Sequence, residues 1–173
     1  MNNRHHFRPR TARAVADRAD TLEQFGRNVR DWLHEIRRLT TRGGLSAAVS
    51  HRPPRLRGRF PGGQIADAFL AAQVEYLCRR ADIEPPRWTG SPEYVLDDPW
   101  FGYTAAPANL RAILIRDAPV EFKNRNLFTT SEIEWQPRRG RPRKSLEEHR
   151  ETTKLRQRRW RKAHSARPRS SRP

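Results

Sequence analysis

The apolar residues between positions 21 and 39 recur at steps of three and four, which is the spacing of one face of an α-helix. The stripe consists of Leu22, Phe25, Val29, Trp32, Ile36 and Leu39. Thr21 and Gln24 form the capping box typical of a helix start, and Gly43-Gly44 predict a stop. The segment 21–39 is therefore predicted to be an amphipathic helix that packs on a core.

Two later segments show the same period. Residues 64–81 place Ile65, Phe69, Ala72, Tyr76 and Leu77 on one face, and residues 108–117 place Leu110, Ile113 and Leu114 on another. Both segments are predicted to be helices that face the core.

The rest of the middle of the chain has no such period. Residues 85–107 hold five prolines and several large aromatics, which predict an irregular segment packed by its rings. A short helical turn over 119–122, a brief extended piece over 125–128 and a short helix over 131–135 are expected to follow. The fold class predicted by these patterns is mainly α.

Composition limits how much of the chain can belong to this domain. Of the 173 residues, 35% are hydrophobic and the mean hydropathy is −1.00, so burial cannot cover the entropy of folding throughout. We expect one small helical domain at 21–136, with basic and largely disordered arms at 1–20 and 137–173.

The net charge of +17 is unevenly distributed. Residues 1–60 carry 14 Lys or Arg against 5 Asp or Glu, and residues 137–173 carry 15 against 3. Residues 61–136, with 7 against 11, form a net acidic core that holds ten of the fifteen aromatics. The basic segments indicate a polyanionic partner, with nucleic acid the leading class. The segment 42–60 is expected to be a basic loop, where Arg55, Arg57 and Arg59 are candidates for phosphate contacts.

The C-terminal arm contains an AT-hook-like element at 138–144. Its residues are Arg138, Arg139, Gly140, Arg141, Pro142, Arg143 and Lys144. Gly140 lets the backbone approach the minor-groove floor, Pro142 keeps the chain extended, and the flanking arginines suit the electronegative A·T-rich groove. Generic polycation behaviour is the alternative, since an arginine-rich tail contains such a tripeptide by chance.

A helix over 145–164 is possible beyond the hook. Ser145 and Glu148 form a capping box, and Lys154, Arg158 and Lys162 fall on one helical line. Trp160 is available for stacking on unpaired bases. A solvated, partly helical tail fits the same residues.

The middle of the chain resembles small helical bacterial proteins encoded beside nucleotidyltransferase-type toxin genes. The resemblance covers about residues 64–135 and lies in Pro86, Trp88, Tyr94, Leu96, Asp98, Pro99, Trp100, Phe101, Ala118, Pro119, Arg125, Asn126, Leu127 and Phe128. It implies an antitoxin or regulator, with such a toxin as partner and no catalytic residues. In that family the module commonly follows a helix-turn-helix. The segment 44–53 of this chain is not a convincing one, because Ser50 and Pro53 stand where that motif needs apolar residues.

Six residues of this motif are candidates for partner binding or for the core. They are Trp88, Tyr94, Trp100, Phe101, Arg125 and Phe128. The structural interpretation is that the D-P-W-F turn precedes two buried rings and that Arg125-Asn126 pair within the domain.

No catalytic, cofactor or metal-binding residues are predicted. Nucleophile-elbow, dinucleotide and zinc motifs are absent, and the six histidines have no metal-ligand spacing. Asp97-Asp98 are expected to point apart, as neighbours in an extended segment do. Cys78 is the only cysteine, and despite Arg79 and Arg80 beside it we expect a core residue rather than a reactive thiol.

Three functions remain open on the sequence. The first is a non-enzymatic, DNA-associated regulatory or antitoxin-like protein, cytoplasmic and nucleoid-associated, whose middle domain binds a protein partner. The second is an RNA- or ribosome-associated basic protein, and the third is a protein adaptor with solubilising arms. A membrane partner is not expected, because no stretch approaches the ~20 apolar residues of a span.

Overall fold

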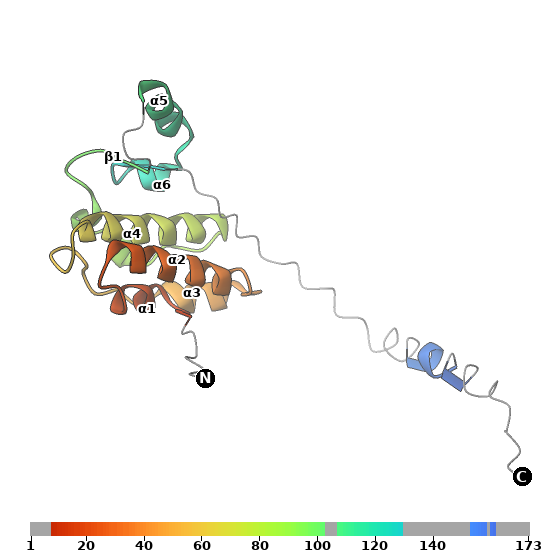
Figure 1. Ribbon diagram of the computed structural model, residues 1–173. Coiled ribbons are helices and arrows are strands. Elements are labelled where there is room, and N and C mark those ends of the chain that lie inside the picture. The colour runs from red at the N-terminus through yellow and green to blue at the C-terminus, as the bar shows by residue number, and fades with distance from the viewer. Residues whose placement is uncertain (1–7, 103–106, 130–152, 159, 162–173) are drawn as a thin grey trace, which may run out of the picture. The chain divides into compact units, whose positions relative to one another are not determined.

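The computed structural model describes residues 8–102, 107–129, 153–158 and 160–161 (Figure 1). The chain divides into two units, Met1–Arg138 and Arg139–Pro173. The described part of the first unit is mainly helical, which confirms the predicted fold class. No helix in the described ranges combines the length and apolarity that a bilayer span requires.

The first three helices are α1 (Ala12–Asp17), α2 (Leu22–Ile36) and α3 (Arg42–Val49). A threonine stands directly before each, and its hydroxyl accepts a hydrogen bond of 3.1 Å from the N–H three residues on. Such a cap satisfies one of the backbone donors that a helix start leaves unpaired. The predicted cap at Thr21 is thereby confirmed, while those at Thr11 and Thr41 were not anticipated.

The structure corrects the predicted N-terminal arm at 1–20. Residues 12–17 form α1, and Ala12, Val15 and Ala16 are fully buried in the same core as α2. The basic composition of the segment was misleading because its arginines project from a helix whose small apolar side chains give a weak periodic signal.

The predicted stop at Gly43-Gly44 and the basic loop at 42–60 are also corrected. Both glycines lie in the first turn of α3, and α2 has already ended at Ile36. The capping hydroxyl of Thr41 offsets the low helix propensity of two glycines, and Leu45, Ala48 and Val49 bury the inner face of the helix. Only the stretch after Ser50 is irregular.

Helix α4 (Gly63–Arg80) has α1, α2 and α3 on one side and β1 (Trp100–Phe101), α5 (Ala108–Asp117) and α6 (Val120–Lys123) on the other (Figure 1). It contributes side chains to two apolar clusters. The first cluster joins α4 to α1, α2 and α3 and also contains Trp88 and Tyr94 from the segment after α4. The second cluster joins α4 to Leu96, Phe122 and Leu127. The helix contributes Ala66, Leu70, Ala71, Val74, Leu77 and Cys78 to the first cluster, which Ala81 just after it joins, and Ala68, Ala72 and Tyr76 to the second. Its many alanines allow close packing on both sides.

The segment after α4 carries two short 3₁₀ turns, η1 (Arg87–Gly90) and η2 (Pro92–Tyr94), and the strand β1 (Trp100–Phe101). Strand β2 (Leu127–Phe128) pairs with β1 in parallel, with Trp100 opposite Leu127. The predicted irregular character holds for the described part, residues 85–102.

Helices α5 (Ala108–Asp117) and α6 (Val120–Lys123) lie between the two strands in sequence. The predicted helix 108–117 has the bounds of α5, but Ile113 is 43% exposed and does not face the core as predicted. Leu114 alone is buried, because α5 packs on the domain along a narrow contact. The predicted helix 131–135 lies outside the described residues.

Cys78 is fully buried in the first cluster, as expected for a core residue. Burial, with a smaller contribution from the Glu75 carboxylate, raises the pKa of its thiol to about 12. We expect iodoacetamide at pH 8 to leave native Cys78 unmodified, because only the thiolate reacts. In urea, where the pKa returns to about 8.5, mass spectrometry should show full labelling.

The raised pKa of Cys78 also makes the stability of the fold depend on pH. The folded-state pKa lies above the unfolded value, so this contribution is complete below about pH 8.5 and is lost as the pH rises toward 12. Equal labelling rates in native and unfolded protein would contradict the buried placement.

Candidate functional site

The chain before α4 is held by a buried carboxylate. Asp67, 3% exposed, accepts hydrogen bonds from the backbone N–H groups of Leu56 and Arg57, each at 2.9 Å, and from Nε of Arg55 at 3.1 Å. Gly63 lies under the same turn, where a Cβ would collide with the carbonyl oxygen of Leu56. These contacts fix the path of the backbone at Arg57.

Two of the three arginines predicted to contact phosphate are engaged within the domain. Arg55 also pairs with Glu93 at 2.7 Å and stands 5.0 Å from the centre of the Tyr94 ring. Arg59 donates to the carbonyl oxygens of Ala16 and Asp17 and pairs with Asp20 at 2.9 Å. The guanidinium groups of Arg55 and Arg59 therefore connect the loop before α4 to α4 and α1, respectively.

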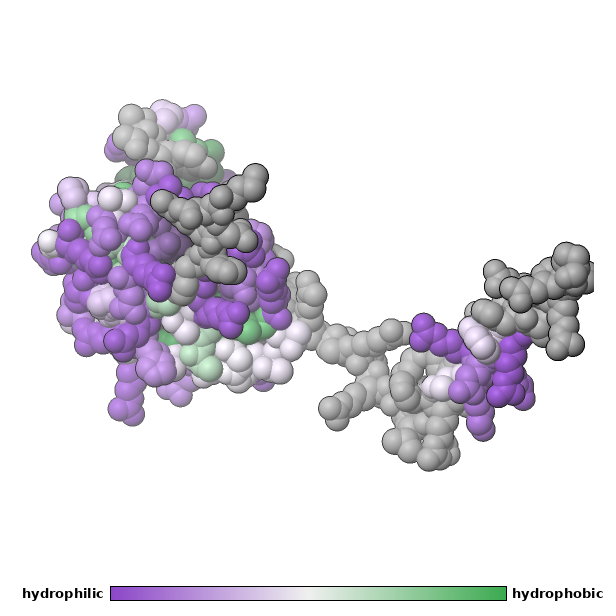
Figure 2. Space-filling view, turned by 60° about the horizontal axis from the view of Figure 1, so that its bottom comes forward, coloured by the Kyte–Doolittle hydropathy of each residue, from purple (hydrophilic) through white to green (hydrophobic). Residues whose placement is uncertain are grey.

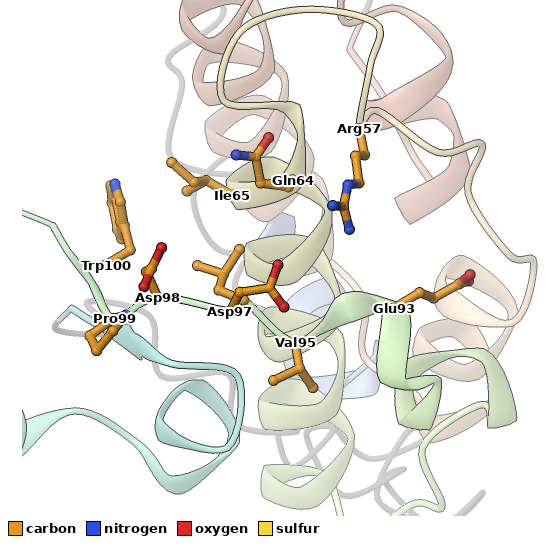
Figure 3. Close-up of a pocket in the computed structure, with 10 residues that line it drawn as sticks. Arg57, Gln64, Ile65, Glu93, Val95, Asp97, Asp98, Pro99 and Trp100 are labelled. Atoms are coloured by element: carbon orange, nitrogen blue, oxygen red, sulfur yellow. The ribbon is translucent and has the colours of Figure 1, made fainter.

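Arg57 differs from these two because its side chain is exposed and faces a groove of about 450 Å³ (Figure 3). The groove lies between the start of α4 and the segment that leads into β1. Its lining comprises Arg57, Gln64, Ile65, Glu93, Val95, Leu96, Asp97, Asp98, Pro99 and Trp100. We call it the acidic groove, since three carboxylates line it against one guanidinium. Their negative charge opposes a phosphate beside Arg57.

Asp97 and Asp98 lie at a bend of the chain and not in an extended segment, and both line the acidic groove (Figure 3). Their carboxylates are directed to different sides within it, in keeping with the expectation that they point apart. Each side of the bend is anchored: the Leu96 carbonyl accepts from Nδ2 of Asn126 at 2.7 Å, and the Trp100 N–H donates to the Asn126 carbonyl at 2.8 Å. Hydrogen bonds to Asn126 thus hold the backbone on both sides of the bend.

A second, apolar groove of about 260 Å³ adjoins the first. Its lining is Leu22, Phe25, Gly26, Val29, Ile65, Ala66, Phe69 and Trp100. Ile65 and Trp100 belong to both grooves, so an apolar depression continues directly from an acidic one. The apolar groove contains no charged side chain.

The six residues predicted for partner binding or the core differ in how far they are buried. Trp88 and Tyr94 are buried with their rings edge to face, and Nε1 of Trp88 donates to the Val49 carbonyl at 3.1 Å. Burial raises the pKa of the Tyr94 phenol, although Arg52 acts in the opposite direction. Trp100 is only half-buried and reaches both grooves.

Phe101 and Phe128 stack on each other across the strand pair, with ring centres 5.1 Å apart. The guanidinium of Arg111 stands 5.2 Å from the centre of the Phe101 ring. Both rings are half-buried. The two rings that follow the D-P turn, Trp100 and Phe101, are each half-buried and not fully buried as the structural interpretation predicted.

Arg125, the sixth residue, is 5% exposed and joins three segments. It donates to the carbonyl oxygens of Glu121 and Thr89, at 2.6 and 2.7 Å, and pairs with Glu75 on α4 at 2.7 Å. Its role is to hold the domain together, so it is not available to a partner.

The second unit places part of the basic arm in a helix. Residues 153–158 are helical, as are residues 160–161, and every one of these eight residues is exposed. Lys154 and Arg158 lie one turn apart, as predicted, and Trp160 is 62% exposed. The hydrophilic colour of this segment in Figure 2 reflects its basic side chains. The hook residues 138–144 and Lys162 lie outside the described residues.

Sequence reasoning missed Asp67, Glu75 and Gln64. Asp67 did carry a signal, because it is the only charged residue between Gly63 and Val74, a stretch that is otherwise apolar or small apart from Gln64 and Gln73. No group of three or more His, Cys, Asp or Glu within the described ranges could hold a metal ion.

Comparisons with protein-family models, with curated proteins and with solved structures found no match to the chain. The resemblance to toxin-associated helical proteins therefore stays a prediction.

Proposed function

We propose that the protein is a non-enzymatic nucleic-acid-binding protein, a DNA-associated regulatory component whose residues 137–173 bind DNA and whose helical domain binds a protein partner. The observation that carries the proposal is the net charge of +12 over residues 137–173, next to a domain segment of net charge −4. Such segregation separates a phosphate-binding segment from one that repels phosphate.

The exposed basic helix supports this division. Lys154, Arg156 and Arg158 are exposed, and none of the described residues 153–158 and 160–161 is buried. The arginines of the domain support it indirectly, because Arg55, Arg59 and Arg125 are engaged by carboxylates and carbonyls. Residues 137–173 offer a polyanion 15 Lys or Arg against only 3 Asp or Glu, and the hook residues 138–144 supply the A·T preference.

The partner class proposed from the resemblance is a nucleotidyltransferase-type toxin, which makes the regulatory role antitoxin-like and the location cytoplasmic, on the nucleoid. RNA is the second candidate ligand, and the 62% exposure of Trp160 favours it, since an accessible indole stacks on unpaired bases.

Fluorescence anisotropy with the full chain separates these ligands. We expect tighter binding to an A·T-rich duplex than to a G·C-rich duplex or to an RNA hairpin of equal length. Neutralisation of about 6 to 10 phosphates should weaken binding by about 10³ to 10⁵ between 50 and 200 mM salt. Equal affinity for both duplexes, with RNA bound more tightly, would overturn the DNA assignment.

The hook is tested by Arg141→Ala, which we expect to remove most of the A·T preference and to weaken binding to the A·T-rich duplex about tenfold. Arg167→Ala is the matched control, because Arg167 also precedes a proline in the same arm but lacks the glycine before it. It should weaken binding to all duplexes slightly and equally. If both variants lost the A·T preference to a similar extent, residues 138–144 would contribute only their positive charge and would not act as an AT-hook.

A further inference from the structure

We infer that the acidic groove and the adjoining apolar groove together bind an extended basic peptide segment of a protein partner. An arginine or lysine side chain lies between Asp97 and Asp98, and a neighbouring large apolar side chain occupies the groove lined by Phe25 and Phe69. The inference rests on the proposed function only in taking the helical domain as the partner-binding part.

The first reason to expect a basic peptide is the negative charge of Asp97 and Asp98. Glu93 already pairs with Arg52 and Arg55, so its charge is met within the domain. Among the described residues, by contrast, no cationic side chain forms an ion pair with Asp97 or Asp98, and both carboxylates face the same cavity (Figure 3). A guanidinium or ammonium group placed in the groove is attracted by both carboxylates and can form a charge-assisted hydrogen bond with either.

The opposite wall supplies donors. Arg57 and Gln64 stand across the groove from the two aspartates (Figure 3), and both side chains offer N–H groups suited to a carbonyl oxygen. The two walls are thus complementary to a peptide, which carries carbonyl acceptors along its backbone and a cation on its side chain. The same carboxylates disfavour a nucleic acid.

The apolar groove provides a second binding site, for an apolar side chain of the same peptide. It begins at Ile65 and Trp100, which border the acidic groove, and continues between α2 and α4 over Phe25, Val29 and Phe69. A charged side chain there would lose its hydration without a partner, so the groove selects an apolar one. Alternate side chains of an extended peptide point to the same side, which lets residues two apart reach both grooves.

The test uses blocked pentapeptides in which one arginine and one leucine are separated by zero to three glycines, titrated into the ¹⁵N-labelled full chain. The indole N–H signal of Trp100, assigned with Trp100→Phe, reports occupancy because Trp100 borders both grooves. We expect a saturable shift for the peptide with matching spacing, and binding at least tenfold weaker when citrulline replaces arginine.

The double variant Asp97→Asn/Asp98→Asn keeps the shape of the groove and removes its charge, so it should weaken peptide binding at least tenfold. The matched control is Asp82→Asn/Glu84→Gln, which removes two exposed carboxylates outside both grooves and should change affinity less than twofold. The inference is overturned if citrulline peptides bind equally, if both double variants lose affinity equally, or if no peptide at millimolar concentration shifts Trp100.

DNA binding by Asp97→Asn/Asp98→Asn separates this inference from the proposed function. We expect unchanged affinity for the A·T-rich duplex, since the two aspartates belong to the helical domain and the hook to the basic arm. DNA binding without peptide binding refutes the groove alone, and peptide binding without DNA binding refutes the nucleic-acid function alone.

Discussion

Replacement of Arg125 by methionine is expected to lower the free energy of unfolding by about 3 kcal/mol, because it removes one partner of a buried ion pair. The guanidinium is 5% exposed and satisfies Glu75 together with two carbonyl oxygens, from Glu121 and Thr89. Methionine fills much of the volume but donates no hydrogen bond, so the Glu121 and Thr89 carbonyl oxygens lose this donor and Glu75 keeps only its pair with Arg79.

Arg79→Met provides a matched control for this variant. Arg79 pairs with the same Glu75 at 2.7 Å, but its side chain is 55% exposed, so water replaces the lost contact. We expect a much smaller change, measured by urea unfolding followed by tryptophan fluorescence. If the two variants were equally stable, Arg125 would not be the joint between α4, the η1 turn and α6 that its contacts indicate.

Asp67→Asn is expected to cost about 2 to 3 kcal/mol, since hydrogen bonds to charged groups contribute about 1.5 to 3 kcal/mol each. The carboxylate accepts from two backbone N–H groups and from Arg55. An asparagine amide keeps one acceptor oxygen but turns its NH₂ group toward a donor, which leaves donor facing donor.

Glu93→Gln is the control for Asp67→Asn, because Glu93 is the other carboxylate on Arg55 and is 38% exposed. We expect a loss of about 1 kcal/mol or less. The Arg57 backbone is also expected to move in Asp67→Asn, so the Trp100 indole signal should shift in that variant without any peptide. An unchanged spectrum with unchanged stability would show that Asp67 does not hold the loop.

The helices that sequence patterns predicted well are those with a long one-sided apolar stripe or a long apolar run. Segments 21–39 and 64–81 correspond to α2 and α4 because large side chains at helical spacing leave few alternatives. The short helices α1 and α3 were missed. Their inner faces are built mainly of alanine and valine, and only the threonines at 11 and 41 mark their starts.

Burial along α5 was predicted less well than its bounds. Ile113 has the size and hydropathy of a core residue, yet only Leu114 on this helix is buried. A helical period shows which residues share a face, but how much of that face is covered depends on the neighbours that tertiary folding supplies.

The ion-pair partner of each charged residue could not be predicted from the sequence. Arg55 meets Asp67 twelve positions away, and Arg125 meets Glu75 fifty positions away, so neither pairing has a local signal. The same counts of arginine and aspartate are compatible with exposed or internal pairs. The charge map predicted where polyanions are attracted and repelled, but only the fold shows that Asp97 and Asp98 face one cavity.

The contribution of α4 to two apolar clusters has a consequence for how the domain unfolds. Ala66 and Leu70 belong to one cluster, Ala68 and Ala72 to the other, and Phe69 touches both. Neither half of the domain can lose this helix without exposing the other half. We therefore expect the described part of the domain to unfold as one cooperative unit, and a partner bound over Phe69 to stabilise both clusters at once.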